Sequence, residues 1–146
     1  MPSEGDLRPT VMIVDDVPAN IMILNALLSK EYRTLVATSG RRALELAFAE
    51  NPPQLILLDV VMPEMDGYQV CQVLKADPRT QAIPVLFVTG QADLEVETRA
   101  FAAGCADLLS KPISPPILYA RVATHLELAE ARRRSTPAGL AQSQID

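Results

Sequence analysis

The sequence predicts an α/β fold, in the form of a doubly wound, five-stranded parallel sheet with helices on both faces. Five short runs of β-branched and other apolar residues alternate with five longer segments of helical periodicity, and turn residues mark each change. Some of the runs are apolar at every position, as expected for strands that are covered on both faces. The length of 146 residues fits one domain of this kind.

The first two strands and helices follow from local signals. In chain order we expect a strand at 10–14, a helix at 18–30, a strand at 33–38 and a helix at 40–50. Pro18 has the fixed φ that suits a first helical turn, and Ser39 can cap the second helix. That helix ends before Pro52 and Pro53, because the residue before a proline is biased away from helical backbone.

The remaining three units carry similar signals. We expect strands at 55–58, 84–89 and 107–110, and helices at 68–76, 94–103 and 114–134, with a turn at 62–67. Gly104 suits the position that follows a helix end, and Pro115 suits a first helical turn. Residues 1–9 form an N-terminal arm and 10–128 the domain itself. Residues 129–146 form a helical extension and, from Ser135, a disordered tail rich in Pro, Gly, Ser and Gln.

The composition excludes several classes of protein. Thirteen basic and 18 acidic residues give a net charge of −5, which disfavours direct binding to nucleic acid or to an anionic membrane. No apolar run reaches the roughly 20 residues of a membrane span, and residues 1–9 lack the apolar segment of a signal peptide. We therefore expect a cytoplasmic protein. Cys71 and Cys105 form no CxxC motif, so we expect reduced thiols rather than a disulfide or a zinc site.

Chemically active side chains follow the carboxyl ends of four expected strands. Asp15 and Asp16 follow the first strand, Asp59 the third, Thr89 ends the fourth, and Lys111 follows the fifth. Open parallel sheets bind ligands at this edge, so we expect these groups to meet there. Taken singly, such acids often cap helices, a strand-end threonine is often only β-branched filler, and a lysine is often merely solvated. Their occurrence at the same end of four strands favours a functional site.

The grouping of three carboxylates requires a positive counter-charge. Each pair repels by about 4 kcal/mol at 4 Å and an effective dielectric of 20. Lys111 supplies one positive charge, and Mg²⁺, which prefers oxygen ligands, water and phosphate, can supply two more. A metal at this position would allow one carboxylate to attack phosphorus. We therefore expect phosphoryl transfer to Asp59, with Thr89 and Lys111 donating hydrogen bonds to the phosphoryl oxygens.

Four motifs in residues 10–128 resemble those of the response-regulator receiver domains of bacterial two-component signalling. They are Val14-Asp15-Asp16, Leu58-Asp59-Val60-Val61-Met62-Pro63-Glu64-Met65-Asp66-Gly67, Val88-Thr89-Gly90 and Ser110-Lys111-Pro112. The resemblance implies the flavodoxin-like strand order 2-1-3-4-5. It also implies a signalling switch rather than an enzyme with turnover, and a histidine kinase or phosphotransfer protein as the partner.

The resemblance also implies a role for each site residue. Asp59 is the phosphoacceptor, Lys111 pairs with the phosphate, and Thr89 bonds a phosphoryl oxygen. The residues expected to hold Mg²⁺ are Asp16, Asp59, the carbonyl of Val61 and, through a metal-bound water, Asp15. The Lys111–Pro112 peptide bond is expected to be cis.

One position departs from the family pattern. Leu108 stands three residues before the lysine, where the family usually has Tyr or Phe. The phosphorylation chemistry does not need that aromatic ring. The ring is needed for the usual relay of the phosphorylation signal to one face of the domain, formed by residues 94–103, 107–110 and 114–134. A module that binds partners without phosphorylation is therefore an alternative. A phosphohydrolase of the haloacid-dehalogenase type is a weaker one, because Val61 stands where that family has a second acid.

The last helix suggests how the domain assembles. Residues 113–134 are similar to the final receiver helix of regulators that continue into cyclic-di-GMP enzymes, or of hybrid kinases, although no GGDEF or HD-GYP sequence is present. Val122, Leu126, Ala129 and Arg133 fall near one helical stripe, which predicts a homodimer.

His125, the only histidine, is expected to be a surface or packing residue without an acidic partner in helical register. The sequence does not identify the downstream output domain or partner.

Overall fold

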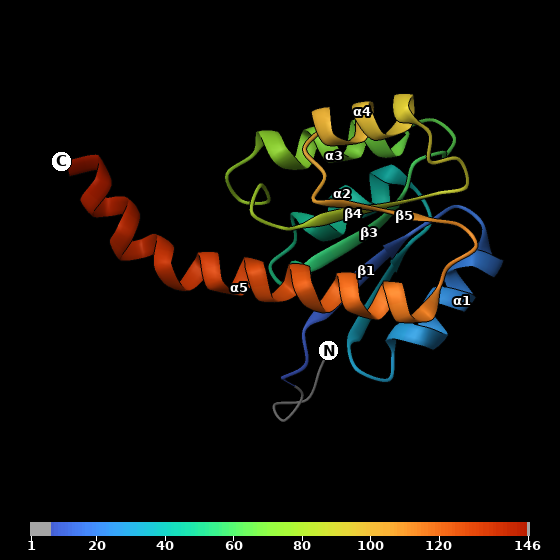
Figure 1. Ribbon diagram of the computed structural model, residues 1–146, viewed down its shortest axis with the longest axis horizontal. Coiled ribbons are helices and arrows are strands. Elements are labelled where there is room, and N and C mark those ends of the chain that lie inside the picture. The colour runs from blue at the N-terminus through green and yellow to red at the C-terminus, as the bar shows by residue number, and fades with distance from the viewer. Residues whose placement is uncertain (1–6, 146) are drawn as a thin grey trace.

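The computed structural model describes the backbone of residues 7–145 and the side chains of residues 7–134. Within that part of the chain, five parallel strands form one sheet in the order β2-β1-β3-β4-β5, which confirms the predicted topology (Figure 1). The strands are β1 (Thr10–Val14), β2 (Arg33–Ala37), β3 (Leu55–Asp59), β4 (Val85–Thr89) and β5 (Asp107–Ser110). The order reverses at β1, which lies between β2 and β3. The carboxyl ends of β1 and β3 therefore border the point where such sheets bind ligands.

Helices cover both faces of the sheet (Figure 1). They are α1 (Pro18–Leu28), α2 (Gly40–Ala47), α3 (Gly67–Ala76), α4 (Leu94–Ala102) and α5 (Pro115–Ile145). One cluster of buried side chains joins the sheet to α2, α3 and α4, and the other joins it to α1 and α5. Alternate strand residues enter opposite clusters, so Met12 packs on the α3 side and Ile13 on the α1 side. Burial on both faces explains the uninterrupted apolar runs.

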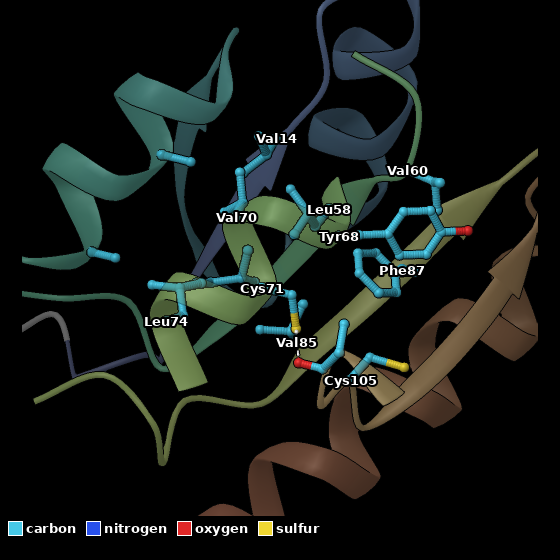
Figure 2. Packing of buried hydrophobic residues seen from close by; sticks show 14 of the residues in the cluster. Val14, Leu58, Val60, Tyr68, Val70, Cys71, Leu74, Val85, Phe87 and Cys105 are labelled. Carbon is cyan, nitrogen blue, oxygen red and sulfur yellow. Dashed lines mark hydrogen bonds between the residues drawn. The ribbon is translucent and has the colours of Figure 1, made fainter. Parts of the chain in front are cut away.

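The cluster under α3 contains both cysteines (Figure 2). Cys71 and Cys105 are buried free thiols, as predicted, and the Cys71 Sγ–H donates to the carbonyl of Ala103 over 3.4 Å. Burial raises the pKa of Cys71 to about 11 and that of Cys105 to about 12. Both thiols therefore stay protonated at neutral pH and pack as small apolar side chains.

Local signals account for the helix ends. Pro18 begins α1, and the Ser39 hydroxyl accepts a hydrogen bond from the Arg42 N–H at the start of α2. Gly104, with φ of 102°, follows the end of α4 in a conformation that favours glycine. The start of α3 has a signal that sequence reasoning missed: Asp66 and Gln69 form a reciprocal capping box.

The last helix is longer than predicted. We expected a disordered tail after Arg134, whereas α5 continues to Ile145, and Asp146 lies outside the described residues. An existing helix can be extended without a new nucleation cost, and neither Pro137 nor Gly139 ends α5. Figure 1 shows this end of α5 projecting beyond the sheet and its covering helices. Within the described residues, no helix is both long and apolar enough to cross a membrane.

The apolar stripe of α5 from which we predicted a homodimer, which includes Val122 and Leu126, has a different role. Val122 is fully buried, and Leu126 is half-buried against the core formed with α1 and the sheet. An apolar stripe on a helix satisfies intramolecular and intermolecular packing equally well, so helical spacing alone could not separate the two. These two residues hold α5 on its own sheet and are not available to a second copy.

Candidate functional site

Three carboxylates meet at the carboxyl edge of the sheet. Asp15 and Asp16 follow β1, Asp59 ends β3, and their ligand atoms all lie within 4.8 Å of one another. The register explains the proximity of two of them, because Val14 pairs with Leu58 and the next residues are Asp15 and Asp59. Both of these acids are buried, and Asp16 is half-buried. The predicted acidic cluster is therefore present and partly shielded from water.

Lys111 brings a positive charge to the cluster. Its Nζ lies 3.5 Å from Asp59 Oδ1 and 3.8 Å from Asp15 Oδ2. The Lys111 backbone N–H donates to the Thr89 carbonyl over 2.8 Å, which fixes the residue beside the end of β4. The peptide bond from Lys111 to Pro112 is cis, as predicted. One ammonium group between two buried carboxylates leaves negative charge uncompensated.

The surroundings of Asp59 hold its proton more tightly than usual. Burial, followed by the charge of Asp15, raises its pKa from 3.8 to about 6, while Lys111 and a backbone hydrogen bond from Val61 oppose the rise. The Val61 side chain is itself exposed, so this residue meets the site through its backbone. The carboxyl can thus change charge near neutral pH, and an added cation would favour its ionised form.

The donor set fits a hard divalent ion. The three carboxylate groups offer oxygen ligands within 4.8 Å of one another, and Mg²⁺ binds through one or two such groups and keeps several waters. One oxygen of Asp15 already accepts the Val17 N–H over 2.9 Å. The other oxygen of Asp15, which lies 3.8 Å from Lys111 Nζ, is the one left to face a metal or a metal-bound water.

Thr89 lies beside this cluster but is bonded within its own loop. It ends β4 and is buried. Its Oγ1 accepts the Gln91 N–H over 3.1 Å and donates to the Gln91 carbonyl over 3.4 Å. The structure therefore brings Asp15, Asp16, Asp59 and Lys111 together as predicted. It also places Thr89 at the same edge, with its hydroxyl bonded to the loop that leads into α4.

His125 and Arg121 of α5 form polar contacts with Asp107 of β5. We expected no acidic partner in helical register, and the partner comes instead from β5: His125 Nε2 lies 2.9 Å from Asp107 Oδ2. Arg121 also lies 3.3 Å from Asp107 and donates to the Leu108 carbonyl over 2.9 Å. Helical periodicity could not find a pair that is 18 residues apart in sequence. The cluster fastens α5 to β5, away from the three carboxylates.

Leu108 of β5 stands where the family usually has an aromatic ring, and the aromatic residues Tyr68 and Phe87 lie on α3 and β4 instead. Leu108 packs against the α3-side core and pairs in register with Phe87 of β4. The Tyr68 ring meets Phe87 edge-on at 5.5 Å (Figure 2). The Arg99 guanidinium lies 4.1 Å from the centre of the Tyr68 ring. These contacts tie α3 to β4 and α4, and sequence reasoning missed them because each partner comes from a different element.

A cavity of about 660 Å³ lies at the opposite edge of the sheet. Pro84 and Ala106, which precede β4 and β5, line it together with Lys75 and His125. None of the predicted site residues contributes to it. The candidate site is therefore the acidic cluster at the carboxyl edge and not this cavity.

The chain is similar to known proteins over most of its length. The family model described as the response regulator receiver domain matches residues 11–123. A probable cyclic di-GMP phosphodiesterase of Vibrio cholerae is 47% identical over 118 residues, which cover 81% of this chain and 26% of that protein. The polar-differentiation response regulator DivK of Brucella ovis is 38% identical over 121 residues, covering 82% of this chain and 98% of DivK.

Solved structures give the same result. A putative response regulator from Chloroflexus aurantiacus superposes with a TM-score of 0.78 at 34% identity, over 82% of this chain and 98% of that one. By contrast, the chain spans only about a quarter of the length of the Vibrio cholerae relative. The similarity to that protein is therefore confined to one segment of it.

Proposed function

Because this chain belongs to the response regulator receiver domain family, we propose that it is a signalling switch controlled by phosphorylation of Asp59. The phosphoryl donor is a histidine kinase or a phosphotransfer protein. The observation that carries the proposal is the grouping of Asp15, Asp16 and Asp59 around one point, with Lys111 3.5 Å from Asp59. The domain catalyses only its own phosphorylation and dephosphorylation, and its product is a changed surface rather than a released molecule.

In the proposed reaction, an Asp59 carboxylate oxygen attacks the phosphorus atom. The new P–O bond forms as the bond from phosphorus to the donor imidazole nitrogen breaks, and the nitrogen keeps the electron pair. Lys111 and Thr89 donate hydrogen bonds to the phosphoryl oxygens. Lys111 already faces Asp59, whereas the Thr89 hydroxyl must first turn from the Gln91 carbonyl.

We assign Mg²⁺ to the acidic cluster. Asp16, Asp59 and the Val61 carbonyl would bind it directly, and Asp15 through a water molecule. When bound, the ion neutralises charge on the carboxylates and on the incoming phosphoryl group. Asp15 and Asp16 hold it beside Asp59, and Lys111 balances the negative charge that remains.

Acetyl phosphate labelling tests the proposal. We expect Mg²⁺-dependent incorporation of phosphate that EDTA abolishes and that Asp59→Ala eliminates. Asp77→Asn is the matched control, because Asp77 pairs with Arg79 away from the cluster and should label normally. Labelling that persists in Asp59→Ala would refute the assignment.

Leu108 keeps a second function open, namely a module that binds its partner without phosphorylation. Beryllofluoride, which mimics a phosphoryl group on an aspartate, separates the two functions. A switch should change its exchange or association behaviour when beryllofluoride and Mg²⁺ are added, whereas a constitutive module should not. Steady hydrolysis of small phosphate esters would instead favour a phosphohydrolase. Such an enzyme needs a second acid at the position that Val61 occupies here.

We further propose that the switched surface is the face formed by α4, β5 and α5, and that it mediates a phosphorylation-dependent homodimer. Leu94 and Phe101 of α4 and Ile117 of α5 are large apolar side chains exposed on the two helices that flank β5 (Figure 1). Light scattering with and without beryllofluoride tests this. A dimer should form or strengthen when beryllofluoride is present, and a monomer under both conditions would contradict the dimer.

A further inference from the structure

The loop between β4 and α4 links the Thr89 hydroxyl to the start of α4 through hydrogen bonds. The hydroxyl bonds both backbone groups of Gln91. The Gln91 amide Nε2–H then donates to Asp93 Oδ2 over 3.2 Å, and Asp93 Oδ1 accepts the Val96 N–H over 2.9 Å as the N-cap of α4. Each group in this series therefore contacts the next, from the predicted site to a helix end.

The single proton of the Thr89 hydroxyl makes the first contact sensitive to a phosphoryl group. In the structure the Gln91 carbonyl oxygen, at a long 3.4 Å from Oγ1, is the acceptor for this proton. A hydroxyl donates one hydrogen bond at a time. If it donates to a phosphoryl oxygen on Asp59, the bond to Gln91 is lost and the loop loses one of its two attachments to Thr89.

The helix at the other end of the series is weakly anchored. Of the residues of α4, all of which the structure describes, only Ala100 is buried. A helix with so few buried side chains depends strongly on its end contacts, here the Asp93 cap and the Arg99 stack on Tyr68. A change at the cap should therefore alter the stability of the first turn of α4.

We propose that Gln91 and Asp93 are positioning residues that couple the Thr89 hydroxyl to the first turn of α4. The coupling is polar and lies along one loop, so it does not need the aromatic ring that Leu108 replaces. The inference rests on the proposed phosphorylation of Asp59. It goes further because it names the side chains through which phosphorylation of Asp59 would alter the first turn of α4.

Amide hydrogen exchange of the full chain tests the coupling, with beryllofluoride and Mg²⁺ as the probe. In the native chain the Val96 and Glu97 amides, whose acceptors are both on Asp93, should change their exchange rates about fivefold or more, the lower range of coupling between sites. Gln91→Ala keeps the backbone bonds to Thr89 but removes the link to Asp93. The change in its exchange rates should fall below about twofold, which is less than the lower end of that range.

Two further variants separate coupling from simple loosening. Gln91→Glu places two carboxylates together and should also lose the response. Combining it with Asp93→Asn should restore the response, because the new amide at 93 donates to the new carboxylate at 91 and still caps the helix. Arg99→Gln removes the stack on Tyr68. It should raise exchange of α4 in both states while the response to beryllofluoride persists.

Acetyl phosphate labelling of each variant distinguishes failure of the coupling from failure of the proposed function. If Asp59 is labelled but the native chain shows no response at Val96, or Gln91→Ala responds like the native chain, the coupling is refuted and the proposed function stands. If Asp59 is not labelled in the native chain, the proposed function fails and the coupling fails with it.

Discussion

The Nζ atom of Lys111 lies 3.5 Å from Oδ1 of Asp59, across the carboxyl ends of two strands that are not neighbours in the sheet. The cation therefore sits on the group that we propose as the phosphoacceptor and does not point into solvent. Its position suits it to bind a phosphoryl oxygen without a large movement.

Replacing Lys111 by Met should slow the labelling of Asp59 by acetyl phosphate about tenfold or more. The variant loses a charge-assisted hydrogen bond to the transferring group, which is worth about 1.5–3 kcal/mol. Initial labelling rates at fixed Mg²⁺ provide the measurement, and Lys30→Met, an exposed site at the end of α1, is the control. An unchanged rate in Lys111→Met would remove Lys111 from the proposed mechanism.

Replacing Asp59 by Asn should stabilise the metal-free protein at about pH 7.5, by about 1–3 kcal/mol. The folded carboxyl keeps its proton up to about pH 6, whereas its ordinary pKa is 3.8. The folded state therefore binds more protons than the unfolded state between these values, and the native chain loses stability as pH rises through this window. The neutral amide does not titrate, so its advantage appears above about pH 6 and disappears below about pH 4.

Urea denaturation in EDTA measures this difference at both pH values. The Asp77→Asn variant, at an acid outside the cluster, should not show the same pH-dependent gain. A variant at Asp59 that is less stable than the native chain at about pH 7.5 would mean that burial and Asp15 do not penalise the ionised carboxyl as described.

Adding Mg²⁺ at about 100 times its dissociation constant should stabilise the folded chain by about 2.7 kcal/mol and raise its Tm by about 5–10 °C. Asp16→Ala should lose most of this shift, because it removes a proposed direct ligand. Thermal melting with and without Mg²⁺ gives the result. If Asp16→Ala keeps the full shift, the ion binds elsewhere.

Replacing Asp107 by Ala should cost about 1–3 kcal/mol of unfolding free energy, because Arg121 and His125 lose their shared partner. Labelling of Asp59 should continue, since the cluster lies apart from the three carboxylates. Chemical denaturation measures the cost against Glu50→Ala, a control at an exposed acid after α2 that should change stability by less than about 0.5 kcal/mol. A loss of labelling in folded Asp107→Ala would show that the α5 attachment serves the site directly.

Features carried by local sequence patterns were predictable. The run from Leu55 to Leu58 required a strand buried on both faces, and Asp59 at its end required a place at the carboxyl edge. Parallel pairing then brought Asp15 beside Asp59, so most of the candidate site followed from strand order alone.

Features that depend on three-dimensional packing were not predictable in the same way. The partner of His125 comes from β5, and the contact of Arg99 with Tyr68 joins two helices. Val122 shows the same limit, because helical spacing identified an apolar stripe but not the surface it packs against. The rotamer of Thr89 was likewise hidden, since a strand-end position does not determine whether the hydroxyl bonds its loop or a ligand.

Mapping the phosphorylated residue tests the central claim most directly. After treatment with acetyl phosphate and Mg²⁺, borohydride reduction of an acyl phosphate leaves an alcohol that mass spectrometry can locate in the peptide chain. We expect one Mg²⁺-dependent modification, at Asp59. Modification at another residue, or none in the presence of Mg²⁺, would contradict the account.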